Sequence, residues 1–260
     1  MVKLRSTFIT SFKEPLTTWL NSSIIGRAHQ NNILDTAVIS ILEKLSFDHH
    51  AIDDTPYGGG PGELMKIDIL GPMIKTALST HEQIPRAQKR VLLMDPAGLV
   101  FTQEKAYDLS TYQELIFISG RYEGIDARIH YYVDEALSIG DFVLSSGDLA
   151  AMAIFDATAR FVDGVLGNNR SHLNESHQAG RLENSLYTRP RSYDGYHVPD
   201  VFCRGNHKEI KQAQELESII KTKSLRPDLL QKYPLEKDEL SLLKEAQNLA
   251  CNYPWMKSHE

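Results

Sequence analysis

The first two-thirds of the chain alternates short apolar runs with helix-like segments, and this order constrains the fold more than any other feature. Such alternation is typical of β-α-β units, which build a parallel sheet with helices packed on its faces. The sequence predicts strands at residues 6–11, 35–41, 90–94, 114–119 and 135–139. It predicts helices at residues 15–22, 62–68, 72–79, 124–132 and 147–162. The predicted fold class is therefore α/β with a parallel sheet.

Three glycine-bearing segments follow predicted strands: DPAG at 95–98, GRYEG at 120–124 and SIGD at 138–141. Ligands of open parallel sheets bind in the loops beyond the carboxyl ends of the strands. We therefore expect the three segments to line one pocket for a small molecule.

A fourth glycine-rich segment, YGGGPG, occupies residues 57–62. It has neither the Lys-Ser/Thr pair of a phosphate-binding P-loop nor the spacing of a dinucleotide fingerprint. Glycines allow positive φ and a close approach of the backbone to a ligand, but they also build ordinary tight turns. The segment alone leaves a ligand-shaping loop and a structural turn both open.

The last third of the chain changes character. Residues 168–180 are polar without apolar periodicity, which is typical of a flexible connection. Beyond them, Asn206 with Glu209 resembles a capping box, Pro227 suits the first turn of a helix, and residues 235–251 have apolar helical spacing. We predict a domain over 1–167, a linker over 168–186 and a small, mainly helical domain over 187–260.

Composition narrows the class of protein. The contents of 42% hydrophobic and 24% charged residues are ordinary for a globular protein. Two cysteines are too few for a disulfide framework, and no apolar run approaches the length of a membrane span. We therefore expect a reduced, cytoplasmic protein. The net charge of −6 argues mildly against nucleic acid. Residues 181–232, however, hold ten Lys/Arg against seven Asp/Glu. This excess indicates either a patch that steers an anionic partner or a solvated helical face.

Four motifs, in a fixed order, resemble bacterial tRNA (guanine-N1)-methyltransferases of the TrmD type: IDDTPYGGGPGELM, SGRYEGIDARI, SIGDFVLSSGDLAAMAIFDATARFVDGVLG and LYTRP. Shorter echoes at both ends extend the resemblance over nearly the whole chain. This family belongs to the SPOUT class of S-adenosylmethionine-dependent enzymes. The resemblance implies helices on both faces of the parallel sheet, a deep trefoil knot in the first domain, and tRNA binding by the helical last domain.

The resemblance also implies where the ligands bind. It implies a bent S-adenosylmethionine held in the knot by Met94, Asp95, Pro96, Gly120, Tyr122, Glu123, Ile139, Gly140, Asp141, Phe142, Val143, Leu144, Ser146, Gly147 and Ala150. It implies that the YGGGPG loop covers the cofactor and a flipped guanine, and that tRNA is contacted by Tyr57, Gly58, Gly59, Gly60, Pro61 and Arg189. No metal ligand is implied among these residues, although Mg²⁺ is a further cofactor that the resemblance suggests.

Methyl transfer to N1 of guanine requires a base for the N1 proton and a hydrogen-bond donor for the charge that grows on O6. By resemblance the donor is Arg160. The base falls on Glu175, counted back from LYTRP, at the position where the family has Asp. A solvated loop glutamate and a structural helix-end arginine are the alternative roles of these two residues.

Several positions depart from the family pattern. Ser146, Asp148 and Ala150 stand where Gly, Glu and Pro are typical, Asp95 replaces Ser, and Leu186 replaces the His before YTRP. The resemblance implies methylation of N1 of guanine 37, preceded by guanine 36, in tRNA by a homodimer with shared active sites. The departures keep an alternative open: a diverged SPOUT paralogue that methylates another RNA position, or binds cofactor or RNA without catalysis.

Overall fold

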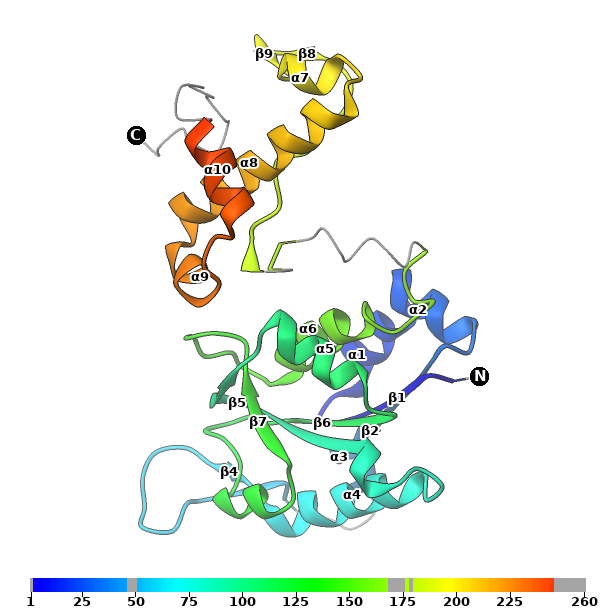
Figure 1. Cartoon of the computed structure of the whole chain (residues 1–260). Helices are drawn as coiled ribbons and strands as arrows, with labels where there is room; N and C mark the ends of the chain where they lie inside the picture. The colour runs from blue at the N-terminus through cyan, green and yellow to red at the C-terminus, as the bar shows by residue number, and fades with distance from the viewer. Residues whose placement is uncertain (1, 46–50, 168–175, 178–179, 246–260) are drawn as a thin grey trace. The chain divides into compact units, whose positions relative to one another are not determined.

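The computed structural model describes residues 2–45, 51–167, 176–177 and 180–245. The chain divides into two compact units, Met1–Asn169 and Arg170–Glu260 (Figure 1). Among the described residues, no helix combines the length and the apolar character needed to cross a membrane.

The first unit is built on a five-stranded sheet with the order β2-β1-β6-β5-β7, in which all neighbouring strands are parallel. Its strands are β1 (Leu4–Thr10), β2 (Leu34–Ser40), β5 (Lys89–Val100), β6 (Glu114–Ser119) and β7 (Glu135–Ser138). The predicted α/β class with a parallel sheet is therefore confirmed, and all five predicted strands are present.

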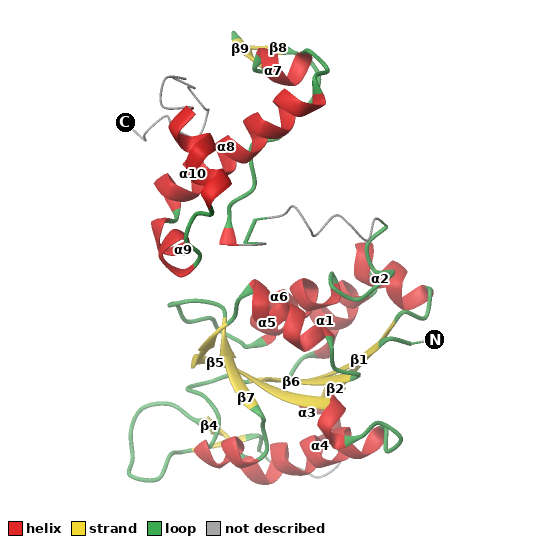
Figure 2. Ribbon diagram, viewed as in Figure 1, coloured by secondary structure: helices red, strands yellow, loops and turns green. Residues whose placement is uncertain are grey.

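Helices cover both faces of the sheet (Figure 2). One face carries α1 (Lys13–Leu20), α2 (Ser23–Gln30), α5 (Gln103–Ser110) and α6 (Asp148–Ala159). The other carries α4 (Ile67–Thr80) and the 3₁₀ helix η2 (Ala127–Tyr131). The remaining elements are α3 (Ile41–Leu45), η1 (Arg86–Gln88) and an antiparallel ribbon of β3 (Asp53–Asp54) and β4 (Leu64–Met65).

Each face of the sheet buries its own hydrophobic cluster, because successive side chains of a strand point to opposite faces. On the α6 face, the rings of Phe8 and Phe117 stack with centroids 4.8 Å apart. Phe155 of α6 meets the Phe8 ring edge-on at 5.3 Å. Ile9 and Ile118 are buried on the α4 face. This packing fixes the start of α6 beside the carboxyl ends of the central strands.

The predicted helices at 62–68 and 72–79 were wrong in their boundaries. Residues 64–65 pair with β3 as a strand, and α4 runs without a break from Ile67 to Thr80 through Pro72. A proline inside a helix removes one backbone hydrogen bond. Here the buried residues Leu70, Met73 and Ile74 hold the helix on the sheet around it.

Three other predictions changed on the structure. The segment 95–98 is not a loop after a strand but an irregular part of β5, whose pairing with β7 shifts between Met94 and Leu99. The predicted helix at 124–132 is only η2, with Asp126 accepting a hydrogen bond from the Arg128 backbone N–H at its start. The helices α2, α3 and α5 were missed, although Thr102 caps α5 by accepting from the Lys105 N–H, a signal that the sequence contains.

The second unit contains a two-stranded hairpin and four helices within the described residues. They are β8 (Ser192–Tyr193), β9 (Tyr196–His197), α7 (Asp200–Cys203), α8 (His207–Leu225), α9 (Pro227–Lys232) and α10 (Lys237–Glu245). Asn206 caps α8 as predicted, accepting from the Lys208 and Glu209 N–H groups at 3.2 and 3.5 Å. Pro227 begins α9 as predicted. The predicted helix at 235–251 includes α10, and its last residues lie outside the described part.

Residues 181–185 of the predicted linker lie against α8. Leu182 donates its N–H to Thr222 Oγ1 at 2.8 Å and accepts from Ser218 Oγ at 2.6 Å. The Arg181 guanidinium makes two hydrogen bonds to the Glu239 carboxylate, at 2.9 and 2.7 Å, and a third to the Tyr233 carbonyl. This stretch is therefore part of the second unit rather than a connection.

The Arg181–Glu239 pair yields an expectation for acid stability. The hydrogen bonds from Arg181 are the largest cause that lowers the pKa of Glu239 below its usual value. A carboxyl with a lowered folded-state pKa stabilises the fold above its unfolded-state pKa and loses this contribution as pH falls through the folded value. Glu239→Gln should lower the free energy of unfolding by about 1.5–3 kcal/mol at pH 7. The gap from wild type should begin to narrow near the ordinary glutamate pKa of about 4.3 and close as pH falls through the lowered pKa of folded Glu239.

Urea unfolding of the second unit from pH 7 to pH 3, followed by circular dichroism, measures this gap. Asp238→Asn is the matched control, because it removes an exposed carboxylate one position earlier in α10. A gap between Glu239→Gln and wild type that stays constant with pH would contradict the assignment.

Candidate active site

A cavity of about 330 Å³ lies where β6 and β7 end and where β5 becomes irregular after Met94. The three predicted segments meet there. Fourteen of the predicted cofactor residues line it: Met94, Asp95, Pro96, Gly120, Tyr122, Glu123, Ile139, Gly140, Phe142, Val143, Leu144, Ser146, Gly147 and Ala150. Asp141 is exposed and does not line it.

Nine other lining residues were not named as cofactor contacts, although three of them stand in the segments that we expected at the pocket. The nine are Leu93, Arg121, Gly124, Ile125, Ile129, His130, Leu137, Ser138 and Ser145. Arg121 and His130 are the two basic side chains among them. Arg121 stands inside the GRYEG segment itself, so its position could have been anticipated. Its guanidinium stacks over the Phe12 ring, 4.7 Å from the centroid.

The loop after β7 is held in a tight conformation around Gly140. Gly140 has φ +148°, and a Cβ built there would lie 2.7 Å from Cε1 of Phe142. Ser138 Oγ accepts from the Gly140 N–H at 3.2 Å. Because backbone and ring are in contact at this point, only glycine leaves both the loop and Phe142 where they are.

Gly147 joins this loop to the loop after β6. Its N–H donates to the Gly120 carbonyl at 2.9 Å. A Cβ at Gly147 would lie 2.9–3.1 Å from Met94 Cβ, the Gly120 nitrogen and Ser119 Cα. The start of α6 therefore packs directly on the backbone at the ends of β5 and β6, and the cavity wall here is mostly main chain.

The irregular part of β5 supplies the third wall. The Asp95 carboxylate accepts from the Ala97 N–H at 2.8 Å and closes the turn within the strand. A Cβ at Gly98 would lie 2.5–2.6 Å from backbone atoms of Ala136 and Leu137, so this turn presses against β7. The fixed turn keeps Asp95 and Pro96 at the cavity.

Acidic groups surround the mouth of the cavity. A hydrogen bond with Asp53, reinforced by the charge of that carboxylate, raises the pKa of Glu63 above its usual value. Burial, with the nearby Asp53 carboxylate as the next cause, raises the pKa of the Tyr122 phenol. The lining itself contains two carboxylates, Asp95 and Glu123, and two basic side chains, Arg121 and His130.

The YGGGPG loop projects from the first unit next to β4 (Figure 1). Tyr57 is fully exposed, and residues Gly58 to Gly60 have φ of +90°, +75° and +135° with nothing within 4 Å of their Cβ positions. Residues 57–61 do not line the cavity. Gly62, at the end of the loop, packs against the side chain of Glu123, which lines the cavity: a Cβ built at Gly62 would overlap that side chain.

The two predicted catalytic residues have different outcomes. Arg160 is the C-cap of α6, whereas Ala150 at the other end of that helix lines the cavity. Ten helical residues separate them, which is about 15 Å along the helix axis. The structure therefore does not bring Arg160 to the cavity of its own chain. Glu175 lies outside the described residues.

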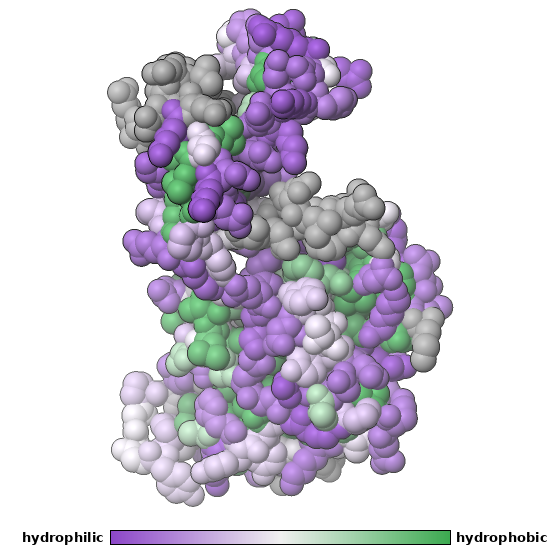
Figure 3. Space-filling model, viewed as in Figure 1, coloured by the Kyte–Doolittle hydropathy of each residue, from purple (hydrophilic) through white to green (hydrophobic). Residues whose placement is uncertain are grey.

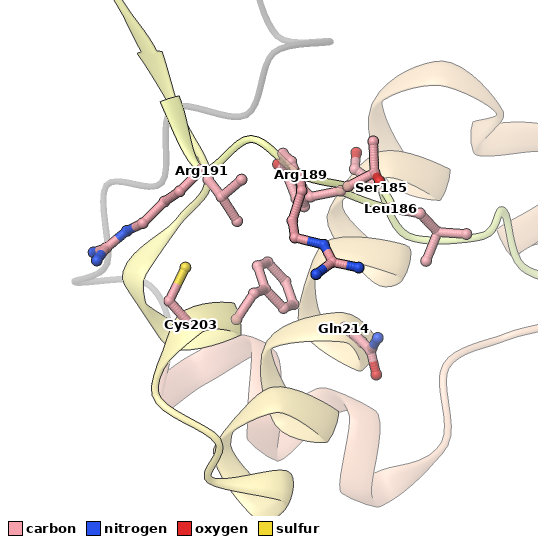
Figure 4. Close-up of a pocket in the computed structure, with 10 residues that line it drawn as sticks. Ser185, Leu186, Arg189, Arg191, Cys203 and Gln214 are labelled. Atoms are coloured by element: carbon pink, nitrogen blue, oxygen red, sulfur yellow. The ribbon is translucent and has the colours of Figure 1, made fainter. Parts of the chain in front are cut away.

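Arg189 lies in a second cavity of about 420 Å³, within the second unit (Figure 4). Its lining combines aromatic and apolar walls with polar groups: Ser185, Leu186, Tyr187, Thr188, Arg189, Arg191, Val198, Phe202, Cys203 and Gln214. Burial, followed by the charge of Glu217, raises the pKa of the Tyr187 phenol. Arg189 is the one predicted site residue in this cavity among those that the structure describes.

No cluster of three or more His, Cys, Asp or Glu side chains suited to a metal ion occurs within residues 2–45, 51–167, 176–177 and 180–245. The described part of the chain thus offers no support for the Mg²⁺ that the resemblance suggests.

Comparison with known proteins gives a consistent result. The sequence model of one family, described as tRNA (Guanine-1)-methyltransferase TrmD, matches residues 4–232. A tRNA (guanine-N(1)-)-methyltransferase of Clostridium botulinum is 39% identical over 93% of this chain and 98% of its own length. Proteins of the same name from Streptococcus uberis and Thermus thermophilus are 42% and 37% identical. These matches cover 86% and 93% of this chain and 91% and 98% of the relatives. The chain belongs to the TrmD family of tRNA (guanine-N1)-methyltransferases.

Proposed function

We propose that this protein is an enzyme that methylates N1 of guanine 37 in tRNA, with S-adenosylmethionine as the methyl donor. The observation that carries the proposal is the cavity at the edge of the sheet, which brings together segments from two of the family's motifs, SGRYEGIDARI and SIGDFVLSSGDLAAMAIFDATARFVDGVLG. The near full-length similarity to enzymes named tRNA (guanine-N(1)-)-methyltransferase supports the reaction and the RNA substrate. A protein that acts on tRNA is expected in the cytoplasm.

The residues of the cavity suit S-adenosylmethionine. A volume of about 330 Å³ is in the range of small-molecule sites. Main-chain groups around Gly140 and Gly147 are available to an adenosine, and the Tyr122 and Phe142 rings offer apolar surface to it. The Asp95 and Glu123 carboxylates suit the positive sulfonium. When bound, the cofactor supplies an electrophilic methyl group.

The chain's own residues then have to prepare guanine. In the proposed mechanism, the Glu175 carboxylate removes the N1 proton and leaves the N1 lone pair available. The Arg160 guanidinium donates a hydrogen bond to O6, where negative charge develops. The open YGGGPG loop closes over the extruded base, since enzymes that modify a base take it out of the stack. Its unhindered glycines permit that approach.

Two finer features of the fold belong to the proposal. The segments at Gly120 and at residues 139–144 thread a trefoil knot, as in the family, which would explain why the cavity wall is main chain. The second unit binds tRNA beyond the target base, with guanine 36 before guanine 37 as the preferred context.

Two copies of the chain are needed to complete the proposed site. Arg160 is about 15 Å along α6 from the cavity of its own chain, so an Arg160 that reaches guanine must belong to a second copy. Apolar residues gather near the end of β5 (Figure 3). The exposed large apolar side chains around the cavity are Leu99, Val100, Phe142, Val143 and Leu149. Such a surface suits a homodimer interface beside the cavity.

Complementation tests the shared sites. Glu175→Gln and Gly140→Val proteins should each be inactive, one through the linker and the other through the cofactor cavity. In a mixed dimer, one composite site retains both intact parts. Equal mixing should therefore restore up to about a quarter of the wild-type sites. Native mass spectrometry reports whether heterodimers form. Heterodimers without any recovered activity would contradict sites shared between subunits.

A methyl-transfer assay tests the function itself. Wild-type protein with labelled S-adenosylmethionine should transfer methyl to an unmodified tRNA transcript with G36-G37, and nuclease mapping should find the label at N1 of guanine 37. Label on a ribose or on another base would assign the chain to a different RNA methyltransferase. Cofactor binding without transfer would favour a binding protein.

A further inference from the structure

The mechanism proposed above does not use the cavity of the second unit, whose lining includes two aromatic rings and two arginines. Tyr187 and Phe202 pack with ring centroids 5.4 Å apart at 34°, and both rings line it. Part of the wall is therefore made of two neighbouring aromatic rings, tilted relative to each other. Its volume of about 420 Å³ is in the range of pockets that hold small organic ligands. A planar, apolar partner fits such a wall.

Two arginines line this cavity, and they differ in direction and in ion pairing. Arg191 points away from it and pairs with Asp200 at 2.7 Å (Figure 4). The Arg189 side chain extends over the cavity towards Gln214 (Figure 4). Arg189 is exposed and makes no ion pair with any residue of the described part of the chain. An exposed guanidinium beside an aromatic wall suits an anionic group attached to a planar one.

The hairpin of β8 and β9 rises from the edge of this cavity, between Arg191 and Val198, whose backbone groups are hydrogen-bonded at 2.9 Å. Its tip carries Tyr193 and Tyr196, which are paired across the strands and are 70% and 68% exposed. Paired cross-strand residues of an antiparallel ribbon lie on the same side of it. Asp194 and Gly195 both have positive φ, which fixes the two-residue turn between the tyrosines.

The charge around these features favours an anion. Residues 185–214 contain five Lys/Arg and three Asp/Glu, whereas the whole chain has a net charge of −6. Exposed aromatic rings beside cationic side chains are the pattern by which proteins hold unpaired nucleotides, because every base has a face that can stack.

We infer that the cavity and the tyrosine hairpin of the second unit form a binding site for unpaired nucleotides of the tRNA. One base stacks against Tyr187 and Phe202 with its phosphate at Arg189, and the tyrosines at the hairpin tip stack with a neighbouring nucleotide. The inference rests on the proposed function. It adds a second point at which the tRNA is held, through stacking rather than through base pairing.

Affinity for a full-length tRNA transcript, measured by fluorescence anisotropy at fixed salt, tests the site. The double variant Tyr193→Ser/Tyr196→Ser removes two exposed rings and should weaken binding about 5- to 150-fold. The variant Tyr193→Phe/Tyr196→Phe keeps the rings and should stay near wild type. Arg189→Gln should weaken binding and lower the slope of log affinity against log salt by about one.

Arg226→Gln is the matched control for Arg189, because this exposed arginine lies at the far end of α8 and pairs with Asp228. Calorimetric affinity for S-adenosylmethionine should be unchanged in all variants. Serine and Arg189→Gln variants that bind tRNA within twofold of a wild type that methylates guanine 37 would overturn the site and leave the proposed function intact. A wild type that neither binds nor methylates tRNA would overturn both.

Discussion

Replacing Glu175 by Gln is expected to slow methyl transfer by about 10²–10⁴-fold, the usual effect of losing a positioned general base. The amide keeps the shape of the side chain but cannot accept the N1 proton at neutral pH. Cofactor affinity should barely change, because the residues that line the cavity in the described part of the chain all lie between positions 93 and 150. Single-turnover methyl transfer to a G36-G37 transcript separates this chemical effect from binding.

Two further variants sharpen the test. Glu175→Asp restores the residue usual in the family and should remain active, since a carboxylate is kept. Arg160→Ala should also lower the rate, because a hydrogen bond to a charged group is worth about 1.5–3 kcal/mol and strengthens as charge grows on O6. A Glu175→Gln enzyme within about threefold of wild type would mean that Glu175 is a solvated loop residue and that another group is the base.

Much of the first unit could be predicted because its signals are local. β6 is the predicted segment 114–119 to the residue, and every one of its side chains is buried. The carboxyl ends of β5, β6 and β7 meet because all three strands are parallel, which follows from the alternating pattern. That inference placed the three glycine-bearing segments at one pocket, whereas the individual cofactor residues came from the resemblance to the family.

What could not be predicted depends on contacts between distant segments. The turn at 95–98 stays within β5 because Gly98 presses on the backbone of β7, a contact that no local pattern reveals. The β3–β4 ribbon has only two residues in each strand, on either side of the glycine loop. Strands this short show no alternation of apolar and polar residues in the sequence. His130 reaches the cavity through the 3₁₀ turn η2, where a longer helix was expected.

The position of Arg160 cannot be explained by the cavity of its own chain. The motif that contains it resembles the family, and its helix is present with nearly the predicted bounds. Its distance of about 15 Å along α6 from Ala150, which lines the cavity, could not be read from the motif alone. The shared dimer site proposed above is the simplest arrangement that reconciles the motif with the helix.

The cofactor cavity itself is tested by Gly140→Val, for which we expect loss of measurable S-adenosylmethionine binding. A Cβ at this position would lie 2.7 Å from the Phe142 ring, and φ of +148° is strained for any residue other than glycine. Backbone strain of this kind costs about 1–3 kcal/mol and overpacking about as much again. The loop relieves both by moving, and it then no longer presents residues 139–144 to the cofactor.

The size of the effect depends on how much binding free energy the cofactor loses when the loop at residues 139–144 moves. Loss of only about 2 kcal/mol of cofactor contact lowers affinity roughly 30-fold. Gly167→Val is the matched control: it makes the same substitution in the same unit, at a glycine with no atom within 4 Å of its Cβ position. That variant should bind like wild type in calorimetry. Equal affinity for wild type and Gly140→Val, with unchanged circular dichroism, would show that the Gly140 loop does not hold the cofactor. The methyl donor would then have to bind outside the cavity at the ends of β5, β6 and β7, and the proposed mechanism would lose its methyl source at that edge of the sheet.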